Sequence, residues 1–455
     1  MTRGAPALVP FALMALAALV AAAATVAGHR THPALPLAAV AAIALAAVPP
    51  MVVLHLAVAL IPLELATASL GGAAVSPTEA AFTLAGLGWA ARRVLASEPP
   101  VTPSPLNAPL AMLLLATAAG VAVGVDPATA AKRVVIGTAL FFVIQMLAAE
   151  GSARTVRTLL LVLVGSGAVV ALVAVLGAAG GRPELVGFGG VAKNRATGSF
   201  DEPNLLASFL GFALPAALAL AFTTRAVFRP ALLGAFGLIL MGIVLSLSRG
   251  GLLAALGGTL VMLGWRPVRR AAMVVAVSIV LLAALSAAPL PGSQYVDLVT
   301  SRIEAVQYTG AATGDFRREL WATTPAIIGD HLVLGIGAGS YPAVSQTYGL
   351  IDPNQGDAIE HAHSVFLTVA VETGLLGIVA LLLLAVRLPV LLTEACRRTA
   401  GRDRGLAFAV AGGLTAFGVQ GLVDHTLWSN TIAALVATFL GLAVVLRRSA
   451  AGPEP

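Results

Sequence analysis

The sequence predicts an all-α, polytopic integral membrane protein: a bundle of about 12–14 transmembrane helices with a small helical subdomain on the outer side. Of its 455 residues, 58% are hydrophobic and only 11% are charged, whereas an average globular domain carries about a quarter charged residues. Apolar runs such as 5–27, 159–176 and 364–386 reach the length that a helix needs to cross a bilayer. So much apolar surface cannot be hidden from water, which excludes an ordinary soluble protein.

The apolar runs divide the chain into 14 candidate spans, with a margin of about two because 34–67 and 230–265 can be divided differently. The runs lack the alternation of polar and apolar residues that a transmembrane barrel requires, so helices are predicted. The first run exceeds the apolar core of a typical secretory signal and is followed by many spans, which favours an uncleaved helix. The candidate spans are 5–27, 34–49, 51–67, 77–95, 106–124, 132–149, 155–177, 204–223, 230–248, 250–265, 270–288, 364–386, 405–423 and 428–446.

The positions of Lys and Arg predict that both termini are cytoplasmic. In this orientation 17 of the 27 basic residues lie on the inner side, mostly in short loops. They occur at the ends of apolar runs and form no continuous stripe, which argues against nucleic-acid binding. The single cysteine, Cys396, excludes an intramolecular disulfide and a cysteine metal cluster. The inner residues are Arg3, Arg92, Arg93, Arg154, Arg157, Arg225, Arg229, Arg266, Arg269, Arg270, Arg387, Arg397, Arg398, Arg402, Arg404, Arg447 and Arg448.

Two outer segments, 178–203 and 288–363, are too long to be simple connections. The second holds a dense mixture of polar, aromatic and charged residues, and its stretch 315–328 is predicted to be an amphipathic helix. We therefore expect any chemistry to lie on the outer, periplasmic face. The predicted organisation is N-terminal transmembrane helices over 1–190, a core over 191–386 that includes the outer loop, and C-terminal helices with a short cytoplasmic tail over 387–455.

Basic residues on the predicted outer side are candidate ligands of an anion, because the positive-inside tendency would place them elsewhere. Arg195 and Arg317 are the main candidates, together with Arg249 at a Ser-Arg-Gly-Gly break between two apolar runs. A guanidinium stays charged and binds phosphate oxygens bidentately. Lys193 and Arg318 are secondary candidates. Alternatively, the loop cations pair with nearby carboxylates, and Arg249 extends to the membrane interface.

Two histidines, His361 and His363, lie where the outer loop re-enters the membrane. A titratable imidazole at this mouth is a candidate general base for a hydroxyl, and His363 is preferred. Their i, i+2 spacing shares no helix face, and no cluster of Asp, Glu or Cys completes a zinc site, so no metal is expected. Glu372 is a secondary candidate inside the following span. Asp424 is interpreted either as a partner of the site or as a helix cap.

Taken in order, several motifs resemble the O-antigen ligase and polymerase superfamily, the membrane enzymes with a Wzy-C type domain. The resemblance covers about residues 190–380 and implies a metal-independent transferase. Its donor would be an undecaprenyl-pyrophosphate-linked glycan, and its acceptor lipid A-core or another glycan. It implies that Arg195 and Arg317 hold the pyrophosphate and that His363 activates the acceptor hydroxyl. Arg249 would contact the phosphate or support the other arginines structurally. The motifs are 195–204 (RATGSFDEPN), 248–250 (SRG), 317–321 (RRELW), 335–341 (GIGAGSY), 363–367 (HSVFL) and 372–377 (ETGLLG).

The sequence departs from the family pattern at two places, and both leave the identity of the acceptor open. Ser364 stands where Asn usually follows the histidine, and Asp-Glu-Pro-Asn replaces the commoner Asn-Pro-Asn type at 201–204. A ligase, a polymerase and a protein O-oligosaccharyltransferase of the bacterial inner membrane all remain open. A transporter of envelope glycan precursors is the alternative from another class, because broken helices and a high glycine content are typical of transporters. A scaffold without chemistry of its own is a third alternative.

Overall fold

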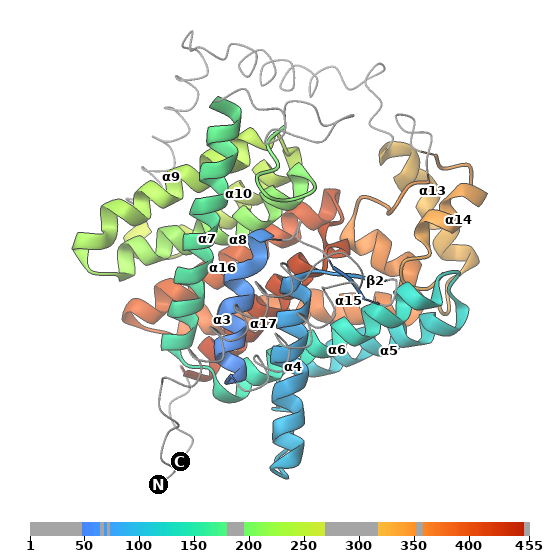
Figure 1. Cartoon of the computed structure of the whole chain (residues 1–455), viewed down its shortest axis with the longest axis horizontal. Coiled ribbons are helices and arrows are strands. Elements are labelled where there is room, and N and C mark those ends of the chain that lie inside the picture. The colour runs from blue at the N-terminus through green and yellow to red at the C-terminus, as the bar shows by residue number, and fades with distance from the viewer. Residues whose placement is uncertain are drawn as a thin grey trace, which may run out of the picture.

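The computed structural model describes residues 48–63, 68–70, 73–179, 195–268, 317–351 and 358–449 (Figure 1). The predicted spans 5–27 and 270–288, nearly all of 34–49, and Lys193 lie outside these residues. Within them the fold is helical, as predicted, apart from a short antiparallel hairpin of β1 (Ala68–Leu70) and β2 (Ala73–Val75).

The described part of the chain contains seven helices that are long and apolar enough to cross a membrane, and three shorter apolar helices. This confirms a polytopic integral membrane protein. The long helices are α6 (Pro127–Glu150), α7 (Ala153–Ala179), α8 (Pro203–Thr223), α9 (Arg229–Leu245), α15 (Val365–Arg398), α16 (Gly401–Val423) and α17 (Asn430–Ser449). The shorter apolar helices are α3 (Pro50–Leu60), α5 (Asn107–Val123) and α10 (Arg249–Met262). The remaining helices are α4 (Pro77–Leu95), α13 (Arg317–Asp330) and α14 (Tyr341–Thr347).

Local signals in the sequence explain several helix ends. Helix α4 has the predicted bounds because Ser76 and Glu79 form a capping box at its start. Over the described part of the predicted span 51–67, α3 ends at Leu60 and a 3₁₀ turn follows that contains Pro62, which lacks an N–H donor. Residues 64–67 lie outside the described residues. Helix α15 is longer than the predicted span 364–386 and runs to Arg398.

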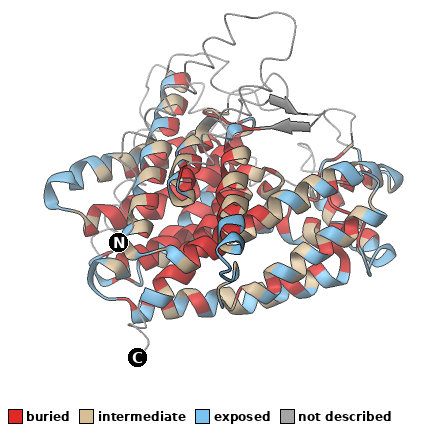
Figure 2. Ribbon diagram, turned by 60° about the horizontal axis from the view of Figure 1, so that its bottom comes forward, coloured by how far each residue is buried: buried red, intermediate tan, exposed pale blue. Residues whose placement is uncertain are grey.

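The core is built around α8, whose apolar 18-residue stretch is 94% buried inside the protein. It packs against α7, α9, α10 and α16, and Figure 2 shows that the buried residues gather at the centre of the bundle. The ring of Phe212 lies 5.9 Å from that of Phe417 and 4.7 Å from that of Phe439, joining α8 to α16 and α17. A helix that is apolar all round is typical of a protein core or a membrane span, and α8 is enclosed by other helices of the bundle.

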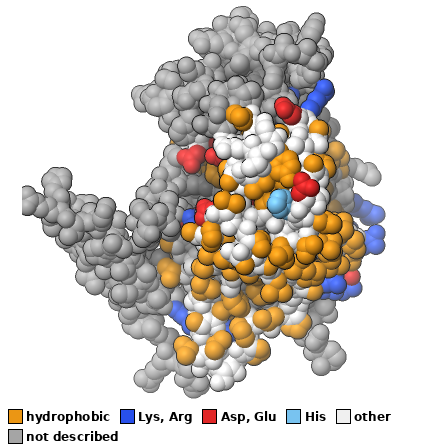
Figure 3. All heavy atoms as spheres, turned by 90° about the vertical axis from the view of Figure 1, so that its right-hand side faces the viewer, with side chains coloured by type: hydrophobic (Ala, Val, Ile, Leu, Met, Phe, Trp, Pro, Cys, Tyr) orange, Lys and Arg blue, Asp and Glu red, His pale blue; other side chains and the backbone are white. Residues whose placement is uncertain are grey.

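The outer surface of the bundle is apolar, as a surface facing lipid requires. On α15 the side chains of Leu375, Leu382 and Val386 are 51%, 62% and 67% exposed. Figure 3 shows hydrophobic side chains spread over the face that lies on the right of Figure 1, with basic side chains at its margins. Such a broad exposed apolar surface is compatible with a bilayer and not with water.

Residues predicted to lie on the inner side gather at one end of the bundle. Arg92 donates to Val48 O at 3.0 Å, and Arg387 donates to Pro105 O at 3.0 Å. Arg447 contacts Glu394 at 2.5 Å, and Arg448 donates to the carbonyl of Ala148. These contacts are made at the predicted inner ends of α3, α4, α6, α15 and α17. The contacts therefore agree with placing these helix ends on the same side of the membrane.

A small subdomain made of α13, α14 and the start of α15 has a hydrophobic core of its own. The amphipathic helix predicted over 315–328 is confirmed from Arg317 onward, where α13 begins. The core is formed by Leu320, Ile327, Ile336, Tyr341, Leu350, Ile359, Ala362 and Val371. The subdomain is joined to α15 at a kink: Gly374 has φ 60° and its Cα would carry a Cβ only 2.5 Å from Gly335 N. A side chain at Gly374 would therefore push the two segments apart.

Candidate active site

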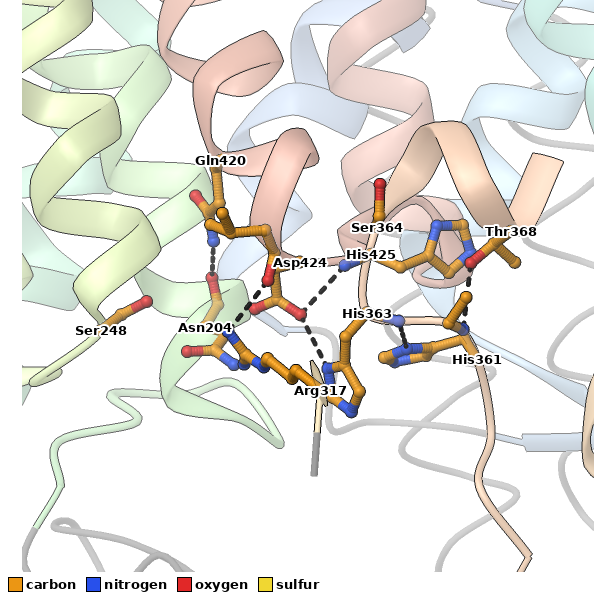
Figure 4. Close-up of polar contacts among 12 residues, drawn as sticks. Asn204, Ser248, Arg317, His361, His363, Ser364, Thr368, Gln420, Asp424 and His425 are labelled. Atoms are coloured by element: carbon orange, nitrogen blue, oxygen red, sulfur yellow. Dashed lines mark hydrogen bonds and ion pairs between the residues drawn. The ribbon is translucent and has the colours of Figure 1, made fainter. Parts of the chain in front are cut away.

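The site begins with a contact between two residues from different helix ends. The Nδ1 atom of His363 lies 3.3 Å from Oδ1 of Asp424, and the two side chains are 21% and 6% exposed (Figure 4). Burial alone would raise the pKa of Asp424, but the hydrogen bond from His363 and the nearby charge of Arg317 hold the pKa of this carboxyl below its usual range. Asp424 is therefore a carboxylate at neutral pH. It accepts from His363 Nδ1, which leaves Nε2 as the basic nitrogen of the neutral ring.

The loop that carries His363 is held from both sides at Ala362. The indole Nε1 of Trp321 on α13 donates to Ala362 O at 3.1 Å, and Ala362 N donates to Thr368 Oγ1 on α15 at 3.2 Å. The side chain of Ser364 donates to Gly421 O at 3.3 Å. These bonds fix the loop against α13, α15 and α16, so the position of His363 is set by three helices.

Arg317 lies beside this pair, at the first residue of α13. Its Nη1 donates to Val423 O at 2.9 Å, and Asp424 follows directly on the chain. The last carbonyls of a helix carry partial negative charge, so a cation here stabilises the end of α16. Arg317 and Trp321 are one turn apart on the same face of α13, which the i, i+4 spacing predicted.

Arg195 reaches the site from the segment before α8. Its Nε donates to Ser246 O at 3.0 Å, and its Nη2 donates to Asn204 Oδ1 at 3.0 Å. Gln420 Nε2 donates to Asn204 O at 3.0 Å, which ties the start of α8 to α16 one turn before Asp424. The guanidinium is therefore anchored by a backbone carbonyl and a side-chain amide. The charge of Arg195 also acts on Glu202, one of the two carboxylates that were its alternative partners, and lowers the pKa of that carboxyl against the larger effect of burial.

Arg249 begins α10 at the predicted break in the membrane. Ser248 caps this helix by accepting from Gly251 N at 3.1 Å, and Leu247 before it has φ 50°. The side chain of Arg249 is exposed. The Ser-Arg-Gly element is thus a helix start, and the carbonyl of Ser246, two residues before it, accepts from Arg195. This contact places Arg249 and Arg195 on adjoining segments.

Two further histidines are buried behind His363. The rings of His361 and His363 are 4.4 Å apart, and those of His361 and His425 are 5.2 Å apart. Burial, together with the neighbouring His363, lowers the pKa of His361 to about 3. Burial also lowers the pKa of His425 well below its usual range. Both rings are therefore neutral at physiological pH. Among the described residues no group of three or more His, Cys, Asp or Glu is arranged to hold a metal ion.

Two secondary candidates lie away from the contacts of His363. Glu372 accepts from Gly339 N at 2.9 Å and pairs with Arg133 on α6 at 3.3 Å, so it fixes the glycine-rich loop of the subdomain to α15. Arg318 is exposed on α13, next to exposed Glu319. These contacts give Glu372 a structural role in this conformation.

Glu202, a carboxyl close to Arg195 in the sequence, also faces the site. Glu202 is the residue directly before α8, and burial followed by the negative charges of Asp424 and Glu360 raises its pKa to about 7. Arg195 opposes this shift. The spacing along the sequence does not connect Glu202, Asn204 and Gln420 with His363. These residues come together only because α8 packs beside α16.

Comparison with known proteins finds a family match for one segment of the chain that carries part of this site. Residues 234–382 match a family model described as O-antigen ligase. The match spans Arg249, Arg317 and His363. A solved structure of a peptidoglycan synthase complex, described for its coordination of polymerization and crosslinking, aligns with 77% of this chain and 98% of its own at 20% identity and a TM-score of 0.42. No curated protein matches the chain.

Proposed function

Because residues 234–382 match a family model described as O-antigen ligase, we propose that the protein is a membrane glycan transferase of the O-antigen ligase type. It moves an undecaprenyl-pyrophosphate-linked oligo- or polysaccharide to an acceptor hydroxyl at the outer face of the bacterial inner membrane. His363 is the general base, and Arg195 and Arg317 bind the pyrophosphate, with Arg249 beside them. No metal takes part in the step.

The hydrogen bond between His363 and Asp424 is the observation that carries this proposal. A general base must be held in one tautomer, with its basic nitrogen facing the hydroxyl. The carboxylate of Asp424 accepts from Nδ1 and so presents Nε2 to the substrate. It also stabilises the imidazolium that forms when the ring takes up a proton. The side chain of His363 is 21% exposed, so a hydroxyl can reach the ring.

The N-termini of four helices lie near the site and support binding of an anion. Helices α8, α10, α13 and α15 begin at Pro203, Arg249, Arg317 and Val365. The contacts of Arg195, Arg317, Ser364 and Gln420 connect these ends to one another and to the end of α16. Each helix N-terminus carries partial positive charge and unpaired N–H groups. Together with the arginines, they would stabilise the negative charge of a pyrophosphate.

The proposed step moves one proton and one glycosyl group. Nε2 of His363 takes the proton of the acceptor hydroxyl while the oxygen attacks the anomeric carbon of the donor. A new bond forms between this oxygen and the anomeric carbon. The bond between that carbon and the pyrophosphate oxygen breaks, and its electron pair stays on undecaprenyl pyrophosphate, whose charge Arg195 and Arg317 balance. His363 then releases its proton to solvent. In-line attack would invert the anomeric centre.

The departure from the family pattern at Ser364 is accommodated by the fold. The hydroxyl of Ser364 donates to the carbonyl of Gly421 and is buried, so it fastens α15 to α16 and faces away from the open side of His363. The ligase and polymerase alternatives differ in the acceptor that receives the glycan. The roles proposed for His363 and the arginines are the same in both.

The test is a transfer assay with purified protein, an undecaprenyl-pyrophosphate glycan and separate acceptors: lipid A-core, a second glycan chain and a protein. Wild-type transfer that disappears in His363→Ala supports the proposal, and the acceptor that is used distinguishes ligase, polymerase and protein glycosylation. His331→Ala, at an exposed histidine of the subdomain, is the matched control and should keep full activity. An intact donor with every acceptor would contradict the transferase proposal, and movement of the donor across vesicles would then support a transporter.

A further inference from the structure

His361 makes a backbone contact that bears directly on the general base. The backbone N of His363 donates to Nδ1 of His361 at 3.2 Å. The side chain of His361 is buried, with 6% of its surface exposed, and its ring packs edge-on against that of His363. This contact is local, because it joins a side chain to the backbone two residues further along the chain.

The backbone of His363 needs such a contact, because it adopts a left-handed conformation. Its φ is 46°, one of three positive values at residues other than glycine in the described part of the chain. This region disfavours side chains with a Cβ, and it persists in folded proteins where surrounding contacts enforce it. An acceptor that reaches the backbone N–H two residues ahead is the device that Asn and Asp use in turns.

We propose that His361 is a positioning residue whose Nδ1 serves as a fixed hydrogen-bond acceptor, holding His363 in the left-handed conformation that directs its ring to Asp424. This inference rests on the proposed function, in which His363 is the general base. His361 touches no substrate in this arrangement and acts through the backbone of His363.

The electrostatic setting of His361 suits an acceptor. A backbone N–H can only donate, so Nδ1 must be unprotonated, and the neutral ring carries its proton on Nε2. The charged and titratable groups that affect this ring are His363, Asp424 and Arg317, and His425 lies in ring contact with it. Burial dominates among them and holds the pKa of His361 at about 3, so the acceptor persists over the whole pH range in which an envelope enzyme works.

Replacement of His361 by Asn and by Leu separates the acceptor from packing. Asn and Leu have nearly the same shape, but only Asn can accept from the N–H of His363. We expect His361→Leu to lower kcat by roughly 10- to 100-fold with the KM for the donor nearly unchanged, as misplacement of a reacting group by about 1 Å does. His361→Asn should retain kcat within roughly threefold of the wild type, because the hydrogen bond is rescued.

A third variant, His361→Phe, keeps an aromatic ring and removes the acceptor. It should behave like His361→Leu. Wild-type kcat in either the Leu or the Phe variant would overturn the proposal, as would an Asn variant that loses as much as the Leu variant. His331→Phe makes the same chemical change at an exposed histidine and is the control. Thermal melting of each purified protein in detergent distinguishes a loss of fold from a loss of kcat.

A spectroscopic measurement keeps this inference independent of the transfer assay. In protein labelled with ¹⁵N-histidine and placed in nanodiscs, the His363 ring nitrogens, assigned by their loss in His363→Ala, report the tautomer held by Asp424. The Leu variant should shift these signals towards a mixture of tautomers, and the Asn variant should leave them in place. Unchanged signals in the Leu variant would overturn the positioning role. Absence of transfer by wild type, with the tautomer shift present, would refute the proposed function alone.

Discussion

Arg317 and Trp321 lie one helical turn apart on α13, and each holds the backbone carbonyl that precedes a member of the candidate pair. Arg317 donates to Val423 O, next to Asp424, and Trp321 donates to Ala362 O, next to His363. One face of one helix therefore fixes the distance between the carboxylate and the imidazole. This explains why a motif of the outer subdomain matters for residues at two distant positions in the sequence.

Replacement of Asp424 by Asn should lower kcat by about 10²–10⁴-fold, the range of a general base that is lost or misdirected. The amide keeps the size of the side chain but removes the charge that stabilises the imidazolium of His363. It can also donate to Nδ1 and so stabilise the wrong tautomer. Initial rates at saturating donor measure the effect. Asp201→Asn, at an exposed acid near the same mouth, is the control, and equal losses in both variants would contradict a specific role for Asp424.

Removal of either guanidinium that we assign to the pyrophosphate should slow transfer by about two to three decades, because a charged contact to the leaving group is lost. The variants are Arg195→Ala and Arg317→Ala, compared at matched membrane levels. Arg402→Ala changes an exposed arginine at the predicted inner side and should keep full activity. Wild-type turnover in both site variants would eliminate the pyrophosphate role.

Incubation with a chelator should leave the purified enzyme active, because arginines and helix N-termini supply the positive charge that other transferases obtain from a divalent ion. Activity is measured after treatment with EDTA and then after addition of Mg²⁺ or Mn²⁺. Complete inhibition that either ion reverses would show that the reaction needs a metal.

The affinity for the donor should fall as the pH rises through about 7, the raised pKa of Glu202. Below this pKa the carboxyl is protonated and neutral. Above it, a negative charge appears beside Arg195 and opposes binding of a pyrophosphate. The KM for the donor should therefore increase from pH 6 to pH 8 in the wild type. Glu202→Gln should flatten this increase, and a Gln variant with the wild-type pH dependence of KM would refute the assignment.

Replacement of Gly374 by Ala should reduce the amount of folded protein, because φ 60° disfavours a side chain and the new Cβ would lie 2.5 Å from Gly335 N. Gly418→Ala places the same methyl group in open space on α16 and should be tolerated. Fluorescence-detected size-exclusion chromatography measures both. Equal yields of the two variants would show that the kink at Gly374 tolerates a Cβ.

The sequence alone determined the membrane class, most of the helix positions and the identity of the principal candidates. Apolar length and positive charge at helix ends act locally, so they can be read from the chain, as the exact bounds of α4 illustrate. Proline also acts locally, as Pro62 in the 3₁₀ turn after α3 illustrates. His363, Arg195 and Arg317 were recognisable because a resemblance joined motifs that are otherwise weak.

Only the tertiary structure decided which of these residues lie together. Asp424 had two interpretations in the sequence, and it is the packing of α16 beside α15 that places its carboxylate on His363. The same packing brings Glu202, Asn204 and Gln420 to the site and assigns Glu372 to a contact with Arg133. The physical reason is that helix periodicity specifies which face of a helix is apolar, while the approach of two helix ends depends on contacts between segments far apart in the chain.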